Sequence, residues 1–152
     1  MKTISPTGKG VRIRDYWGSG LFGAPRGKAS HLGLDQICVP GEPAVALITP
    51  TEFGPSRPYA EKDYGGIFLA NEIFVIELWY VELFAWVLDP KAVIKQGWEI
   101  GICQDIRQRI SRSTGKPYGD KMIPHLHWQV RLRGENHLLE GQDVYINPEV
   151  LM

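Results

Sequence analysis

The chain has 152 residues, and its 17 lysines and arginines are balanced by 17 aspartates and glutamates, so the formal net charge is zero. This length fits a single domain, and an apolar content of 43% is too high for a disordered protein. Zero net charge argues against bulk nucleic-acid binding, which requires a basic surface. Two cysteines are too few for a disulfide scaffold or a zinc site built from thiolates.

Frequent turns divide the chain, because it contains 17 glycines and 11 prolines, and this pattern favours short strands over long helices. Residues 1–30 are rich in glycine and basic side chains and are predicted to form an arm that packs on the rest of the domain. Strands are predicted at residues 30–39, 44–48, 67–70, 73–84, 98–102 and 124–132. Residues 49–65 are predicted to be a loop, residues 105–111 a short helix and residues 136–145 an additional hairpin. The sequence therefore predicts a mostly β fold, with a single small antiparallel β-sheet or sandwich domain at residues 31–152.

The apolar segment at residues 67–88 is the candidate for a membrane span. It carries Glu72, Glu77 and Glu82, and a carboxylate near the bilayer centre costs roughly 2.5–3.5 kcal/mol. A pair of strands explains this segment better, so we expect a soluble protein without a membrane span. The basic N-terminal stretch lacks the apolar core of a signal peptide, which predicts synthesis in the cytoplasm.

Three of the four histidines lie in two compact motifs. His31 and Asp35 are four residues apart, so in a strand their side chains share one face, and Gly33 between them leaves that face open. His125 and His127 repeat this arrangement at a spacing of two in the last predicted strand. Polar and apolar residues alternate along that strand, so one face is expected to pack on the core while the other presents both imidazoles.

Histidine and carboxylate side chains are zinc ligands, and three of them with a water form an open site of the catalytic type. Zinc in such a site lowers the pKa of the water toward neutrality and polarises a carbonyl group. Either motif alone is more often a surface or hydrogen-bonded pair than a metal site. Both motifs together, in a chain with four histidines, favour a metal site. The helical His-Glu-x-x-His motif of many zinc proteases does not occur in the sequence.

Six segments follow one another in a characteristic order. They are a glycine-rich lead-in at residues 18–26, His31-Leu32-Gly33-Leu34-Asp35, Gly41-Glu42-Pro43-Ala44-Val45-Ala46, residues 93–101, Pro124-His125-Leu126-His127-Trp128 and Asn147-Pro148. In this order they resemble the lysostaphin/LytM-type zinc metallopeptidases, which cut peptide cross-bridges in bacterial peptidoglycan. The resemblance extends over most of the chain.

The resemblance implies a set of roles for these residues. His31, Asp35 and His127 would hold a zinc ion, and His125 would be a catalytic residue beside the water. It also implies a small antiparallel β-sheet core with long loops that flank a groove, in agreement with the strands predicted above.

One segment departs from the family pattern. The family carries a second catalytic histidine in a Tyr-x-His-Leu motif, whereas this chain has Tyr80-Val81-Glu82-Leu83. Three roles for Glu82 stay open: a general base on the water, a ligand that fills the open coordination position, or a marker of lost activity in a retained scaffold. Glu82 could also simply reach solvent near the end of its strand.

The leading expectation is a zinc endopeptidase that acts on peptidoglycan peptides. Because such a substrate lies outside the cytoplasm, a bacteriophage virion is the expected carrier, with the protein in the tail or baseplate and its action in the periplasm or cell wall. A lysis enzyme that is released with help is an equal alternative. The alternative is a catalytically silenced, zinc-binding structural or cell-wall-binding component of a phage tail assembly. Two further expectations concern single residues: Cys38 and Cys103 as free, buried thiols, and His137 as a surface residue in a turn.

Overall fold

A computed structural model describes residues 2–60, 63–133 and 143–152 of the chain. Its strands are β1 Pro25–Arg26, β2 Ala29–Ser30, β3 Gly33–Ile37, β4 Pro43–Val45, β5 Glu52–Ser56, β6 Gly66–Ala70, β7 Phe74–Trp79, β8 Val81–Leu83, β9 Glu99–Cys103, β10 His125–Leu132 and β11 Tyr145–Ile146. The helical segments are short 3₁₀ turns: η1 Ala85–Leu88, η2 Ile106–Gln108, η3 Gly119–Lys121 and η5 Pro148–Leu151. The prediction of a mostly β fold is confirmed. Within the described residues, no helix is both long and apolar enough to cross a bilayer.

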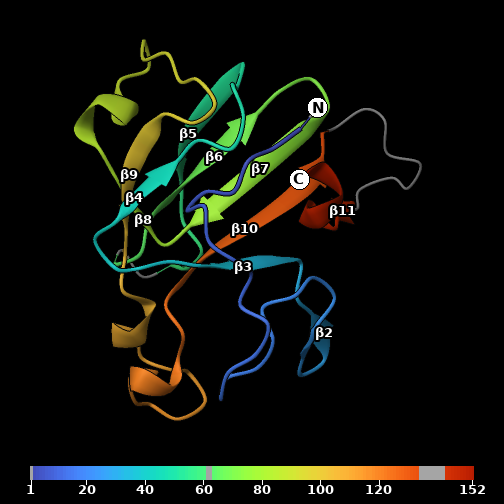
Figure 1. The fold of residues 1–152 in the computed structure, drawn as a ribbon, viewed down its shortest axis with the longest axis vertical. Coiled ribbons are helices and arrows are strands. Elements are labelled where there is room, and N and C mark those ends of the chain that lie inside the picture. Colours follow the sequence, from blue (N-terminus) through green and yellow to red (C-terminus); the bar gives the residue numbers. More distant parts are fainter. Residues whose placement is uncertain (1, 61–62, 134–142) are drawn as a thin grey trace.

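The strands form two main antiparallel sheets and one small hairpin. The larger sheet has six strands in the order β11-β10-β7-β6-β5, with β3 paired to β10 beside β11. The second sheet has the order β4-β9-β8, and β1 pairs with β2 in the N-terminal arm. Figure 1 shows the three-stranded sheet at one side of the larger sheet, with the hairpin of the arm below β3.

Strand β10 lies inside the larger sheet, between β7 on one side and β3 and β11 on the other, and both of its faces are buried. Leu126, Trp128 and Val130 are fully buried in a core that both sheets share. Burying each such side chain contributes about 1.5–3 kcal/mol to folding. His125 and His127 alternate with them on the opposite face and are also buried. The alternation predicted for this strand thus separates an apolar face from a face of imidazoles.

The strand predicted at residues 73–84 is interrupted. Tyr80 has a positive φ of 69°, and the chain leaves the larger sheet there, so β7 and β8 belong to different sheets. Within the described residues, Tyr80 is the only residue other than glycine with a positive φ. A period-two pattern cannot reveal such a break, because the residues on both sides remain extended and apolar.

The prediction of a loop at residues 49–65 is wrong, because this segment contains β5. Gly54 and Pro55 argued against a strand, yet β5 lies at the edge of its sheet and pairs only with β6. On an edge strand the missing N–H of proline is tolerated. The predicted helix at residues 105–111 is present in shortened form as η2, with Asp105 accepting a hydrogen bond from the Arg107 amide at its start. The hairpin expected at residues 136–145, with His137, falls largely outside the described residues.

The N-terminal arm is hydrogen-bonded to the segment that carries the first histidine motif. The amide of Arg12 donates to the carbonyl of Asp35 at 2.7 Å, and the amide of Asp35 donates to the carbonyl of Gly20 at 2.9 Å. The amide of His31 donates to the carbonyl of Ala24 at 2.8 Å. A side chain at Gly20 would collide with the carbonyl oxygen of Arg12 and with Asp35, so glycine is required for this close approach.

Candidate metal centre

Three side chains converge on one point between β3 and β10. Asp35 of β3 stands directly opposite His127 of β10 in the antiparallel register, and His31 precedes β3 by two residues. His31 Nε2 lies 3.0 Å from His127 Nδ1 and 3.2 Å from Asp35 Oδ1, and His127 Nδ1 lies 3.1 Å from Asp35 Oδ1. The three donor atoms therefore form a nearly equilateral triangle.

The triangle fits a metal ion of the size of zinc. Zinc–nitrogen and zinc–oxygen bonds of about 2.0–2.2 Å place tetrahedral ligands about 3.3–3.5 Å apart, slightly wider than the observed separations. The other ring nitrogens are also occupied as metal ligands require. His31 Nδ1 donates to the carbonyl of Leu21 at 2.9 Å, and His127 Nε2 faces Gln129 Oε1 at 3.4 Å. The nitrogens that point at the shared centre are therefore the ones available to bind a metal ion.

Asp35 is held on its second oxygen by two arginines. Arg12 Nη2 donates to Asp35 Oδ2, and both side chains are almost completely buried. Arg26, whose side chain is 30% exposed, reaches the same oxygen at 3.3 Å. Burial raises the pKa of Asp35, but the facing imidazoles of His125, His127 and His31 outweigh it, and this pKa lies well below its ordinary value. Asp35 is therefore a carboxylate with one oxygen directed at the two histidines.

His125 is oriented toward the same centre without being part of the triangle. Its Nδ1 donates to the carbonyl of Ile123 at 2.7 Å, and its Nε2 lies 3.7 Å from Asp35 Oδ2. Burial lowers the pKa of His125 below its ordinary value, even though the carboxylate of Asp35 acts in the opposite direction. His125 Nε2 is thus the ring nitrogen that faces the candidate metal ligands.

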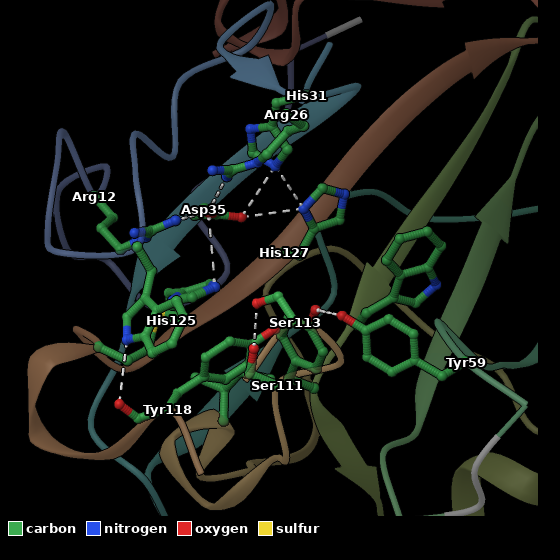
Figure 2. Close-up of a pocket in the computed structure, with 15 residues that line it drawn as sticks. Arg12, Arg26, His31, Asp35, Tyr59, Ser111, Ser113, Tyr118, His125 and His127 are labelled. Atoms are coloured by element: carbon green, nitrogen blue, oxygen red, sulfur yellow. Dashed lines mark hydrogen bonds and ion pairs between the residues drawn. The ribbon is translucent and has the colours of Figure 1, made fainter. Parts of the chain in front are cut away.

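These residues line one side of a pocket of about 320 Å³. Figure 2 shows Asp35 at the centre of the dashed contacts, with His31, His125 and His127 around it. The ring of Trp79 stacks on His127 with a centroid distance of 4.9 Å, so β7 supports the imidazole from β10. Five residues that carry hydroxyl groups also line the pocket: Tyr59, Tyr80, Ser111, Ser113 and Tyr118.

Glu82 is not brought into this pocket. It lies in β8, opposite Ile102 of β9, with an exposed side chain, while its neighbour Val81 is buried in the core. The positive φ of Tyr80 changes which residue faces the pocket, so the ring of Tyr80 occupies a place beside His125 at a centroid distance of 5.8 Å. The geometry therefore gives no support to a catalytic or metal-binding role for Glu82, in contrast to the sequence expectation.

Sequence reasoning brought together four residues that the structure also places together: His31, Asp35, His125 and His127. It did not identify Arg12, Tyr59 or Tyr80 as part of the site. Arg12 lies 23 positions before Asp35 in the chain, and no spacing rule connects residues so far apart. The local sequence offers Asp15 as a partner for Arg12, and the structure has this ion pair at 2.8 Å, so nothing local indicated the second pair with Asp35.

No family profile matches this chain. Leukocyte cell-derived chemotaxin-2 of Mus musculus is 29% identical over 93 residues, and that of Bos taurus is 28% identical over 93 residues. Each alignment covers 60% of this chain, and the chain spans 59% of the length of these relatives. The catalytic domain of the antimicrobial peptidase lysostaphin from Staphylococcus simulans superimposes with a TM-score of 0.54, 20% identity and 88% coverage of both chains. The chain thus has a lysostaphin-like fold.

Proposed function

We propose that this protein is a zinc-dependent endopeptidase that cleaves peptide bonds in bacterial peptidoglycan. The observation that carries the proposal is the triangle of donor atoms from His31, Asp35 and His127, with separations of 3.0–3.2 Å, on the wall of a pocket. The lysostaphin-like fold supports it, because the matched domain is described as the catalytic domain of an antimicrobial peptidase.

Metal binding and proton transfer are assigned to different residues in this proposal. When bound by His31, Asp35 and His127, zinc supplies a Lewis acid that polarises the scissile carbonyl and lowers the pKa of a water toward neutrality. His125 takes a proton from the attacking water at its Nε2 and later gives that proton to the leaving amine. The hydrogen bond from His125 Nδ1 to Ile123 fixes the ring in the tautomer that this role needs. Arg12 keeps Asp35 Oδ2 engaged, so that Oδ1 stays directed at the metal position.

The decisive experiment is digestion of purified peptidoglycan sacculi with the zinc-loaded protein, followed by mass spectrometry of the released muropeptides. We expect new amine and carboxyl ends at one type of peptide bond. His125→Ala should retain zinc but lose cleavage, whereas His127→Ala should lose both zinc and cleavage. Sacculi that remain intact under these conditions would refute the enzymatic proposal.

A second candidate function is a silenced, zinc-binding scaffold. The observation that favours it is the absence of a further histidine among the described residues of the pocket, where the resembling family has a second catalytic one. The sequence relatives point the same way, because their name describes a chemotaxin and not a hydrolase. Under this alternative the protein sediments with sacculi but releases no peptide from them.

The proposal keeps the setting predicted from the sequence. Peptidoglycan peptides are the proposed partner, the cell wall or periplasm is the proposed place of action, and a bacteriophage tail or baseplate is the proposed carrier. Immunodetection of the protein in purified virions tests the carrier independently of the enzymology.

A further inference from the structure

The pocket is lined by two tyrosines whose hydroxyls are hydrogen-bonded to each other. The hydroxyl oxygens of Tyr59 and Tyr80 lie 2.6 Å apart, and both residues line the pocket that holds the candidate metal ligands. The ring of Tyr80 meets the ring of His125 edge to face. Figure 2 shows Tyr59 and the serines Ser111 and Ser113 on the side of the pocket that faces His127 and His125.

The backbone at Tyr80 has a positive φ, and this conformation places the ring beside His125. A positive φ of 69° is rare for an aromatic residue, and such strain persists only where the surrounding structure enforces it. Two backbone contacts enforce it here: the amide of Tyr80 donates to the carbonyl of Gly65 at 2.8 Å, and its carbonyl accepts from the amide of Gln104 at 2.8 Å. The conformation directs the Tyr80 side chain, and not that of Glu82, toward the pocket.

The pair has one hydroxyl proton to spare. One hydroxyl of the two donates to the other, and the receiving hydroxyl keeps a proton that is free to donate to a third atom. The guanidinium of Arg109 lies 3.6 Å from the ring centroid of Tyr59, and this cation polarises the phenol and strengthens it as a donor. The pair therefore retains one hydroxyl proton that can be donated, and both residues line the pocket.

Both phenols stay protonated at neutral pH. Burial raises the pKa of Tyr80 well above its usual value, and burial also raises the pKa of Tyr59. A protonated hydroxyl donates where an ionised carboxylate such as Glu82 only accepts. Peptide hydrolysis needs such a donor at the point where negative charge develops on the carbonyl oxygen.

We infer that the Tyr59–Tyr80 hydroxyl pair donates the hydrogen bond that stabilises the oxyanion during peptide hydrolysis, an inference that rests on the proposed function. The water oxygen bonds to the carbonyl carbon, the π pair of the C=O bond moves to the carbonyl oxygen, and the water proton passes to His125 Nε2. The tyrosine pair donates to the oxyanion and keeps its proton. When the electron pair returns, the C–N bond breaks and the leaving nitrogen takes the proton from His125, which yields a carboxylic acid and an amine.

The test compares Tyr59→Phe, Tyr80→Phe and the double variant with the unaltered protein, all loaded with zinc. Each single variant should keep its zinc and lower kcat by about 10²-fold while KM changes little, because an oxyanion donor acts in the transition state. The double variant should lose hardly more than a single one, because the pair works as a unit.

Tyr64→Phe is the matched control. Tyr64 packs edge-on against Tyr80 at a centroid distance of 5.9 Å, but its hydroxyl donates to the Asp105 carbonyl at 3.2 Å and does not line the pocket. Its kcat should equal that of the unaltered protein. A purely structural role for these tyrosines would instead lower kcat in all three single variants in proportion to their loss of thermal stability.

A second readout is independent of cleavage. Inorganic phosphate is a tetrahedral oxyanion, and calorimetric titration should show at least tenfold weaker binding to zinc-loaded Tyr59→Phe and Tyr80→Phe than to the unaltered protein. If the unaltered protein cleaves nothing, the proposed function fails. The phosphate titration alone then tests whether the tyrosine pair donates a hydrogen bond to an oxyanion. If the protein cleaves peptides and the tyrosine variants keep its kcat, the inference is wrong. If the protein is inert and the tyrosine variants keep its phosphate affinity, the inference is also wrong. Tyr59 is only partly buried, so its variant serves if Tyr80→Phe does not fold.

Discussion

Arg12 and Asp35 are joined twice, once through the backbone and once through their side chains. The Arg12 amide donates to the Asp35 carbonyl at 2.7 Å, and the Arg12 guanidinium pairs with Asp35 Oδ2 at a position where both side chains are at most 3% exposed. A loop-like arm and a candidate metal ligand are thus one structural unit.

The first prediction follows from this ion pair. Arg12→Met should lower the free energy of unfolding by about 3–5 kcal/mol, because it leaves the buried carboxylates of Asp15 and Asp35 without their shared arginine. Arg26→Met removes a charge from the same oxygen, but Arg26 is partly exposed, so the loss should stay below about 1 kcal/mol. Urea unfolding of the metal-free proteins measures both. Equal losses would show that burial of the Arg12 pair is not what matters.

A second prediction concerns metal removal. Zinc that binds the folded state alone stabilises it, by about 4 kcal/mol when its free concentration is 1,000 times the dissociation constant. Chelation should therefore lower the melting temperature, and added zinc should restore it in proportion to the logarithm of its concentration. His31→Ala should melt at the same temperature with and without zinc. If the melting temperature of the unaltered protein is the same with and without zinc, the protein does not bind zinc at this site.

Gly33 provides a third prediction. A Cβ atom there would lie 2.3 Å from the Trp128 carbonyl oxygen and 2.7 Å from His127 Nε2, so Gly33→Ala must displace a candidate ligand. We expect zinc affinity to fall at least tenfold in a calorimetric titration. Gly10→Ala is the matched control, because nothing lies within 4 Å of its added Cβ. A Gly33→Ala protein with normal zinc affinity would show that β3 and β10 can separate without cost to the site.

The fourth prediction concerns Glu82. Because its side chain is exposed on β8, Glu82→Gln should leave zinc content and cleavage within twofold of the unaltered protein. Steady-state kinetics on a cross-linked muropeptide measures this. A loss of cleavage by 10²-fold or more, the size of a general-base effect, would return Glu82 to the mechanism and would require β8 to rearrange.

The thiols provide the fifth prediction. Cys38 and Cys103 are both free and buried, and the neighbouring Cys103 thiol together with burial raises the pKa of Cys38. Neither thiol should react with a thiol reagent until the protein unfolds. Lys91→Cys, which adds a thiol at an exposed position, should react at once and exactly one group per chain should be labelled. A disulfide found in the native protein by mass spectrometry would contradict the expectation of free thiols.

The sequence by itself determined which residues share a face wherever a strand is regular. The period of two along residues 124–132 predicted both the apolar face of β10 and the imidazole face opposite it. The His31 and His127 motifs could be identified in the same way, because each has its chemical meaning within a few residues of chain. Such patterns depend on local backbone geometry, which the sequence carries directly.

Only the tertiary structure decided which residues complete the site. The break at Tyr80 turns Glu82 outward and a phenol inward, and it depends on hydrogen bonds to Gly65 and Gln104 that no local pattern contains. Arg12 reaches Asp35 because the arm folds back on β3. These contacts join segments far apart in the chain, and their free energy comes from burial and pairing that exist only after the sheets have packed.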